Sequence, residues 1–405
     1  MLTFHGAKSL DKISPTSIEA QLKSIQHLIQ TTKFKNAIEQ SRQLLAQNLY
    51  EQHQIELWYL IAVAQRYTKS LSHAFDSIQE LLELSPSHSR AYQEQGYINI
   101  ALNQHSKATF SFEQAVALNP SLVASWQELI QLYREKGQQE QVQKAANQLA
   151  KLKTLPPALL AVTELMHEGK LLRAEQICRH FLQSNNRHIE GMCLLAEIGI
   201  ELKIYDDAEF LLASALELAP NHIHVRSLYL NLLIRLGKYK TAGQQVEKLL
   251  LEQSENLTFK VAKASVLTGL GKVEQAIILF KQAIVKAASQ ATSQVVSIDK
   301  QIASFHLQLG HALKAKGDIE QAIAAYQKAH QLNPSYGDAY WSLANTKTYH
   351  FSDEEIAQMQ AQHLNQNLAL TDQIQLHFAT GKAFEDRHEY HHAFQAYQLG
   401  NELHH

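Results

Sequence analysis

The sequence predicts an all-α protein, a right-handed α-solenoid of about ten to eleven helix–turn–helix units. Composition is the first observation behind this prediction. Ala, Leu, Gln, Glu and Lys are frequent, whereas the 405 residues include only 15 Gly and 7 Pro, a balance that favours helix. The second observation is a spacing of about 34 residues that recurs along most of the chain, as expected of a stack of similar units.

Small residues carry this spacing. Alanines recur at this step at Ala74 and Ala108 and again at Ala174, Ala208, Ala242 and Ala276. A second ladder lies twelve positions earlier, at Ala62, Gly96, Ala196, Leu230, Ala264 and Gly310. Two antiparallel helices approach closely only where such residues stand at their crossing point. The pattern is that of the tetratricopeptide (TPR) repeat, whose unit is a helix–turn–helix of the same length.

Glycine and proline mark where the helices end. The turn between the two helices of a unit is expected at Gly137, Gly169, Gly237, Gly271 and Gly317. Glycine suits this place because it adopts the left-handed conformation that ends a helix. Pro86 and Pro120, separated by one full repeat, are expected to stop second helices, since proline cannot continue the hydrogen-bond ladder.

These signals divide the chain into a segment at 1–17, a TPR array at 18–336 and an irregular, TPR-like junction at 337–405. Units are expected to begin near residues 18, 55, 89, 123, 155, 189, 223, 257 and 303. The unit at 123 is weak, because Val142 stands where alanine is expected. Twelve additional residues at 291–302, "ATSQVVSIDKQI", either lengthen a helix or form a surface loop.

Charge and cysteine content point to a soluble cytoplasmic protein. The net charge of −2 gives no reason to expect a nucleic-acid or membrane partner. No stretch approaches the ~20 apolar residues that cross a bilayer, and the first residues lack the apolar core of a secretory signal. Cys178 and Cys193 cannot form a disulfide framework and are expected to be reduced thiols at apolar positions.

Two motifs suggest chemistry that the repeat does not favour. "HEYHH", residues 388–392, matches the zinc-protease pattern H-E-x-x-H, which needs both histidines one turn apart on a continuous helix. In the repeat, however, His388 falls at the turn position. "TGLGKV", residues 268–273, lacks the first glycine and the final Ser or Thr of a phosphate-binding loop. The sequence therefore predicts no catalytic, cofactor-binding or metal-binding residue and no enzyme activity for this chain alone.

The remaining candidate for a functional site is a binding surface. In a TPR solenoid the first helices line a concave groove, and the second, fifth, ninth and twelfth positions of a unit face it. The candidate groove residues at such positions are Gln127, Gln131, Arg134, Asn231, Arg235, His311, Lys314, Trp341 and Asn345. Their mixture suits hydrogen bonding to an extended peptide, and a merely solvated polar face is the alternative. No unit carries the Lys and Asn pair of a carboxylate clamp.

The repeat changes at residue 337. The unit there begins normally with "GDAYWSLANTK" and is then expected to omit its second helix. Ser352 followed by Glu355 forms a capping-box sequence, which predicts a new helix from Asp353. The helix expected at 389–405 carries an apolar stripe of Ala393, Phe394, Tyr397 and Leu403, through which end-to-end self-association is expected.

The stretches "YWSLANTKTYHFSDEEI" and "QIQLHFATGKAFEDRHEYHHAFQAY" resemble the junction of bacterial TPR-containing sulfotransferases. The resemblance covers residues 337–402. It implies a TPR module that positions a substrate or partner for a C-terminal sulfotransferase domain using 3′-phosphoadenosine-5′-phosphosulfate. The P-R-S-G-[ST]-like stretch that binds the cofactor phosphates in that family is missing here, so no family catalytic residue can be assigned. A free-standing TPR adaptor in a cell-envelope or secretion assembly is the alternative function, and a zinc hydrolase using "HEYHH" is the least favoured.

Overall fold

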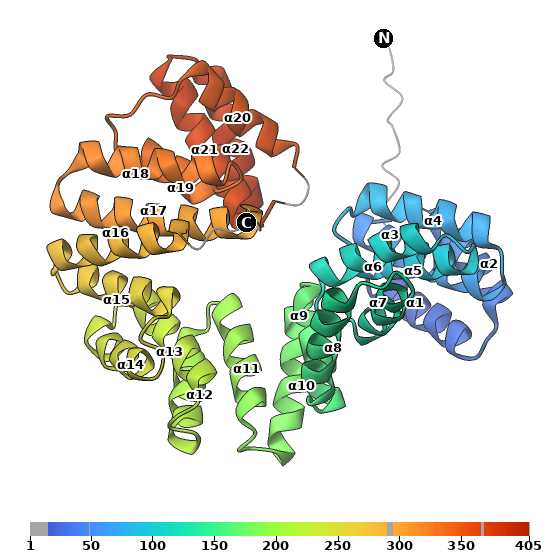
Figure 1. Cartoon of the computed structure of the whole chain (residues 1–405). Coiled ribbons are helices and arrows are strands. Elements are labelled where there is room, and N and C mark those ends of the chain that lie inside the picture. The colour runs from blue at the N-terminus through green and yellow to red at the C-terminus, as the bar shows by residue number, and fades with distance from the viewer. Residues whose placement is uncertain (1–14, 48, 290–294, 366–367, 405) are drawn as a thin grey trace, which may run out of the picture. The chain divides into compact units, whose positions relative to one another are not determined.

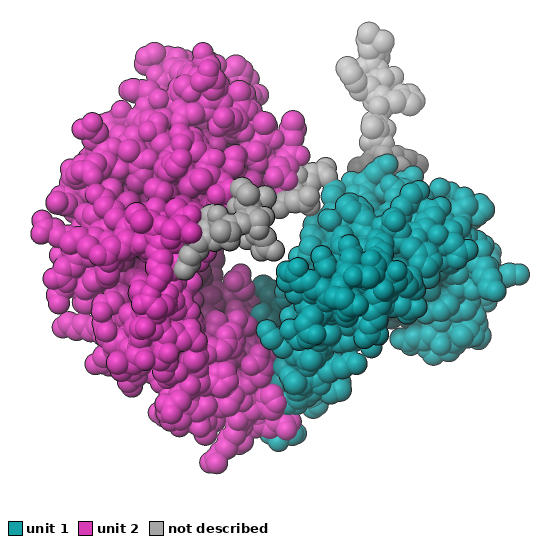
Figure 2. Space-filling view, viewed as in Figure 1, with its two compact units in different colours: residues 1–184 teal, residues 185–405 magenta. Residues whose placement is uncertain are grey.

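The structure, a computed structural model, describes residues 15–47, 49–289, 295–365 and 368–404. These residues form 22 helices and no strand, which confirms the all-α class (Figure 1). The helices fall into two compact units, residues 1–184 and residues 185–405 (Figure 2). In each unit, most consecutive helices pair as antiparallel hairpins of the TPR type.

The described helices of the first unit are α1 (Pro15–Gln30), α2 (Phe34–Leu45), α3 (Glu51–Tyr67), α4 (Leu71–Leu84), α5 (Ser89–Ala101), α6 (His105–Leu118), α7 (Val123–Glu135), α8 (Gln139–Lys153), α9 (Pro157–His167) and α10 (Leu171–Ser184). Those of the second unit are α11 (Ile189–Glu201), α12 (Tyr205–Leu218), α13 (Ile223–Arg235), α14 (Tyr239–Glu252), α15 (Leu257–Gly269), α16 (Val273–Ser289), α17 (Val295–Lys316), α18 (Ile319–Leu332), α19 (Gly337–Ala344), α20 (Asp353–His363), α21 (Leu370–Asp386) and α22 (Tyr390–His404).

A residue in the left-handed conformation ends the first helix of most hairpins. The five predicted turn glycines all have positive φ, from 69° at Gly137 to 89° at Gly317. Where glycine is missing, a polar residue takes the same conformation, as Asn103 does at 57°. Asparagine accepts this conformation more readily than most residues because its side chain bonds locally. The predicted turn ladder is therefore confirmed.

The alanine ladder lies at the helix crossings. Ala74, Ala108, Ala174 and Ala208 are all fully buried. At Gly96, an added Cβ would come within 2.7 Å of the Phe112 ring, so the aromatic side chain fills the space that glycine leaves. In the hairpin at 123, Ala145 is buried and Val142 is only partly so. The core position is thus taken by an alanine one turn later than the ladder predicts.

The additional segment at 291–302 lengthens a helix. Residues 295–302 belong to α17, which at 22 residues is longer than an ordinary first helix of the repeat. Residues 290–294 lie outside the described residues. The prediction that this segment lengthens a helix is therefore confirmed for residues 295–302.

As expected, the unit at 337 has no second helix packed on its first in the usual way, because α19 packs against α21 and α20 is the new helix predicted from Asp353. A connection at 345–352 replaces the usual tight turn and leads into α20. The predicted capping box is confirmed: Ser352 Oγ accepts a hydrogen bond from the Glu355 amide at 3.2 Å, and Glu355 Oε2 accepts one from the Ser352 amide at 2.9 Å. Because the connection is long, α20 can lie against both α18 and α21. One apolar core runs from Val261 to Ala383, across the expected division at residue 337.

Glu355 joins α20 to α18. The Tyr349 hydroxyl donates to Glu355 Oε1 at 2.6 Å and accepts from Gln327 Nε2 at 2.8 Å. His330 Nε2 on α18 lies 3.3 Å from the same carboxylate oxygen. Burial alone would raise the pKa of Glu355, but His330, the Tyr349 hydroxyl and the Ser352 amide outweigh it and lower the pKa to about 2. The carboxylate is therefore ionised in the folded protein well into the acid range.

We predict that Ala208→Arg destabilises the second unit by more than about 3 kcal/mol, because an arginine overpacks a fully buried crossing. Ala150→Arg, on the exposed side of α8, is the matched control and should change stability by less than about 0.5 kcal/mol. Urea unfolding followed by circular dichroism measures both. A loss under about 1 kcal/mol for Ala208→Arg would contradict the crossing position.

We predict that Glu355→Gln lowers the free energy of unfolding by about 2 kcal/mol at pH 7, since hydrogen bonds to a charged group contribute about 1.5–3 kcal/mol. The folded-state pKa lies below the ordinary value of 4.5, so this contribution is complete above pH 4.5 and is lost as the pH falls towards about 2. Urea titrations at pH 7 and pH 3 should therefore show a smaller difference at pH 3. The exposed neighbour Glu354→Gln is the control, and an undiminished difference at pH 3 would contradict the assignment.

Candidate binding site in the first unit

The first unit contains a hollow of about 750 Å³. Its lining comes from α1, α3, the start of α5, α9 and α10. Tyr59 and Val63 occupy the fifth and ninth positions of the unit at 55, and Arg90 the second position of the next unit. These are the positions predicted to face the concave groove. The hollow therefore lies on the face that TPR geometry assigns to ligands.

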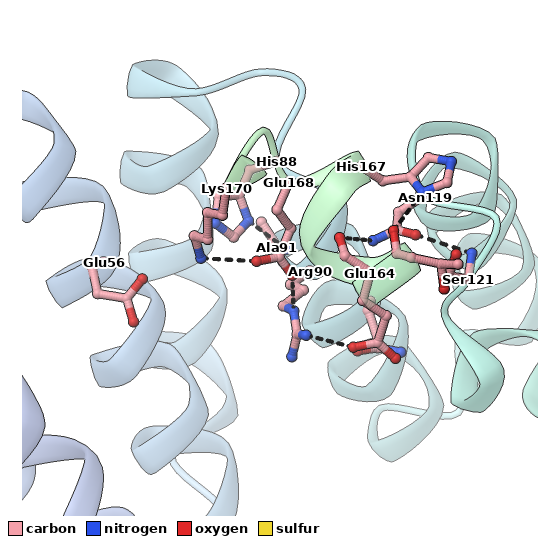
Figure 3. Close-up of polar contacts among 12 residues, drawn as sticks. Glu56, His88, Arg90, Ala91, Asn119, Ser121, Glu164, His167, Glu168 and Lys170 are labelled. Atoms are coloured by element: carbon pink, nitrogen blue, oxygen red, sulfur yellow. Dashed lines mark hydrogen bonds and ion pairs between the residues drawn. The ribbon is translucent and has the colours of Figure 1, made fainter. Parts of the chain in front are cut away.

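An ion-pair cluster holds α9 against α5 beside the hollow (Figure 3). Arg90 Nε lies 2.5 Å from Glu168 Oε1, and Arg90 Nη2 lies 2.8 Å from Glu164 Oε2. Lys170 Nζ is 2.8 Å from the other oxygen of Glu168. Glu164 and Glu168 are four residues apart on α9 and its C-terminal cap, so both carboxylates reach the same guanidinium.

The two carboxylates have different environments. Burial raises the pKa of Glu164, even though Arg90 acts to lower it. Burial also acts to raise the pKa of Glu168, but Lys170 and Arg90 outweigh it and the pKa falls below its usual value. The difference arises because Glu168 faces two cations and Glu164 only one. Burial opposes the charge of Arg90, whose pKa is nevertheless raised by Glu168 and Glu164, so the guanidinium stays charged.

Asn119 supplies a second attachment for α9 (Figure 3). This fully buried side chain donates from Nδ2 to the backbone carbonyl of Glu164 at 3.4 Å. Its Oδ1 accepts a hydrogen bond from the Ser121 amide at 3.0 Å, which fixes the amide orientation. The turn before α7 and the start of α5 thus both hold α9 in place.

His88 and Tyr59 complete the wall beside Arg90. His88 Nδ1 accepts a hydrogen bond from the Ala91 amide at 3.1 Å and so caps α5, which requires a neutral ring. Burial lowers the pKa of His88 and raises the pKa of Tyr59 to about 12, so both are neutral at pH 7. His188 and His222 cap α11 and α13 in the same way. His188 and His222 are separated by one full repeat, and this spacing is the signal in the sequence that could have indicated their capping role.

The predicted groove residues lie elsewhere. All nine are described and none lines the hollow, so the structure does not bring them together with the Arg90 cluster. Gln127, Gln131 and Arg134 are exposed on α7, and Asn231 and Arg235 are exposed on α13. The remaining four, His311, Lys314, Trp341 and Asn345, lie on or next to α17 and α19.

Those four residues are partly engaged by their neighbours. Lys314 Nζ donates to the Asn345 carbonyl at 3.1 Å. His311 Nδ1 lies 3.0 Å from the Tyr326 hydroxyl, and the Trp341 and Phe378 ring centroids are 5.8 Å apart. Their assignment as ligand-binding residues stays a prediction.

The structure confirms that His388 of "HEYHH" lies in the turn between two helices. His388 has a φ of 62° between α21 and α22, while His392 lies on α22 with Nδ1 3.0 Å from Glu389. Among the described residues, no group of three His, Cys, Asp or Glu could hold a metal ion. Cys178 and Cys193 are both buried, and burial raises the pKa of their thiols to about 11 and about 12. No helix in the described ranges is long and apolar enough to cross a membrane.

We predict that Arg90→Met destabilises the first unit by about 1–2 kcal/mol. The value lies between the loss of an exposed pair and that of a fully buried one, because the Arg90 side chain retains 35% of its exposure. Lys144→Met, which breaks the exposed pair with Glu140, is the control and should have almost no effect. Adding Glu164→Gln and Glu168→Gln to Arg90→Met should recover part of the loss in urea unfolding. No recovery would show that the carboxylates do not depend on Arg90.

Comparison with known families identifies repeats in both units. Residues 89–122 match the model of the tetratricopeptide repeat, and residues 310–347 match a second TPR repeat model. No curated protein matches the chain. Neither matching family model is that of a sulfotransferase.

Solved structures of low sequence identity are also similar to the chain. Yeast Tom70 shares 14% identity with a TM-score of 0.42, over 96% of this chain and 92% of that one. Human IFIT1, as a dimer with m7Gppp-AAAA, shares 16% with a TM-score of 0.46, over 78% and 77%. MamA from Desulfovibrio magneticus RS-1 shares 17% with a TM-score of 0.36, over 44% and 94%. The repeat models show that the chain contains TPR repeats at residues 89–122 and 310–347.

Proposed function

We propose that this chain is a protein-interaction scaffold and that the hollow in the first unit binds an extended peptide. The observation that supports this most directly is the position of the hollow on groove-facing positions of consecutive repeats. Clefts of several hundred Å³ with a few convergent polar groups are the usual form of ligand sites. The proposal gives the chain no catalytic role.

The lining matches the chemistry of a peptide. Gln30 and Gln52 present amides that can both donate to and accept from a peptide backbone. Gln26 and Glu56 also line the hollow, and Gln26 Nε2 donates a hydrogen bond to Glu56 Oε1 at 3.0 Å. Ile55 and Ile177 are apolar and offer contacts for side chains of the peptide. Each direct hydrogen bond would add about 0.5–1.5 kcal/mol.

The Arg90 cluster supports binding by holding one wall of the hollow. Arg90 and Asn119 fix α9 at two points before any ligand arrives. A wall that is already ordered loses less conformational entropy on binding, which increases the affinity. Arg90 is in this view a positioning residue, because its guanidinium is occupied by Glu164 and Glu168.

A narrower form of the proposal concerns a sulfotransferase. The resemblance of residues 337–402 to the junction of TPR-containing sulfotransferases supports a role in positioning a substrate for such a domain. Phosphoadenosine phosphosulfate would then bind to that domain. A free-standing adaptor in an envelope or secretion assembly is the alternative, and it shares the peptide-binding site proposed for the first unit.

Peptides selected from a random phage-displayed library against the whole chain test this proposal. We expect Gln52→Trp to weaken the selected peptides at least tenfold, because the indole would occupy the hollow from an exposed position. Asn231→Trp places the same side chain on exposed α13 of the second unit and should leave the affinity unchanged. Fluorescence anisotropy of a labelled peptide measures both variants.

The reverse outcome would contradict the site. If Asn231→Trp abolished binding and Gln52→Trp did not, the predicted groove residues of α13 would carry the function. If neither variant changed the affinity, the peptide would bind outside both grooves. Circular dichroism of each variant establishes that the helices are retained.

A further inference from the structure

A second hollow, of about 450 Å³, lies in the second unit. Helices α14, α15 and α16 line it together with Ser254, which connects α14 to α15. Four leucines, Ala283 and three lysines are among the lining residues, and the lysines are Lys260, Lys263 and Lys286. We call this site the α15 hollow. It shares no lining residue with the hollow of the first unit.

The α15 hollow lies where other repeats place an aromatic side chain. Lys260 occupies the fourth position of the unit that begins at 257. Four other units have Trp or Tyr at this position: Trp58, Tyr92, Trp126 and Tyr340. Tyr340 is fully buried, and Trp126 packs against the apolar core beside α7. A lysine keeps its ammonium group in water and cannot fill the same space, so a gap remains.

Two further lining residues depart from the repeat in the same place. Lys263 stands at the seventh position, which is a buried Ile or Leu in five other units: Ile61, Leu129, Leu195, Leu309 and Leu343. Leu251 is 85% exposed at a position where three other units have a charged residue: Glu83, Lys151 and Glu217. One exposed leucine is ordinary, but three departures that meet at one hollow indicate a site.

The charges around the α15 hollow favour an anionic ligand. Lys263 Nζ lies 2.8 Å from Glu247 Oε1. Lys260 Nζ lies 3.3 Å from one carboxylate oxygen of Glu255, and Lys286 Nζ pairs with the other. Three ammonium groups therefore share two carboxylates, and one positive charge remains. Carboxylates of a ligand would complement it.

The repeat also indicates which ring suits the gap. Trp126 Nε1 donates a hydrogen bond to the Pro120 carbonyl, six residues earlier, at 2.8 Å. The equivalent carbonyl in this unit is that of Ser254, a residue that lines the α15 hollow. Lys260 donates to Glu255 instead. An indole from a ligand could therefore donate to Ser254 as Trp126 does to Pro120.

We propose that the α15 hollow binds an acidic peptide segment of a partner protein, with a tryptophan side chain in the gap and flanking Asp or Glu residues beside Lys263 and Lys286. Tryptophan is among the commonest anchors of protein interfaces. A concave site for one ring suits a single side chain better than the surface of a membrane. Residues 290–294, which lie outside the described residues, contain no aromatic or acidic residue and do not match this chemistry.

Fluorescence anisotropy of the whole chain with the labelled peptide Gly-Asp-Glu-Trp-Glu-Asp-Gly tests the ligand class. We expect this peptide to bind at least tenfold more tightly than one with Ala in place of Trp, and than one with Asn and Gln in place of the acidic residues. Equal affinities, or no binding up to about 1 mM peptide, would overturn the proposal. If phosphatidylglycerol vesicles bound the chain instead, and Leu251→Glu abolished that binding, the partner would be a membrane and the proposal would be wrong.

Variants of the chain test the location. Lys260→Trp restores the ring of the other repeats and should weaken the acidic peptide at least tenfold, equivalent to about 1.4 kcal/mol, because the indole fills the gap from within. Leu251→Glu changes only an exposed side chain and should also weaken it. Circular dichroism establishes that both variants retain their helices.

Two matched substitutions serve as controls. Lys240→Trp, at an exposed position of α14, should leave the affinity for the acidic peptide unchanged. So should Gln52→Trp, which fills the hollow of the first unit. An unchanged affinity in Lys260→Trp would overturn the α15 hollow as the site. A loss in Gln52→Trp alone would place the peptide in the first unit, which would contradict this inference while leaving the proposed function intact.

Discussion

The close approach of two helices at a small residue is the constraint on which the rest of this structure depends. Ala208 and Ala242 are fully buried at such crossings, where a larger side chain would overpack the two helices. Large residues of the second helix, such as Phe112, then fill the space beside the crossing. A hairpin built in this way cannot bury both of its faces alone, and each must therefore pack against a neighbour.

Stacking of this kind creates the proposed site without a dedicated binding domain. Helices that follow one another around the first unit bring the start of α5 and the end of α9 within hydrogen-bonding distance. Arg90 then neutralises two carboxylates that would be costly to bury alone. The same contact that stabilises the unit also fixes a wall of the hollow, so stability and ligand geometry rest on one set of residues.

The junction shows how the chain covers a face with irregular structure. The connection at 345–352 and α20 provide Tyr349 and Glu355, which contact the polar residues of α18. This arrangement places His330, the Tyr349 hydroxyl and the Ser352 amide around the Glu355 carboxylate, and these contacts lower its pKa. On α22, Phe394 is exposed and none of the described residues covers it.

The sequence by itself determined the features that arise within a hairpin: the buried alanines, the turn at Gly271 and the capping box at Ser352. These features depend on local conformation and on residues close along the chain. They can therefore be predicted from the spacing of residue types in the sequence. Only the tertiary structure decided that Arg90 reaches Glu164, 74 residues away, and that α20 lies against α18. Such contacts depend on the angles between successive hairpins, which add up along the stack and are set by the packing of many side chains together. For that reason the residues that meet beside the hollow could not be predicted from the sequence.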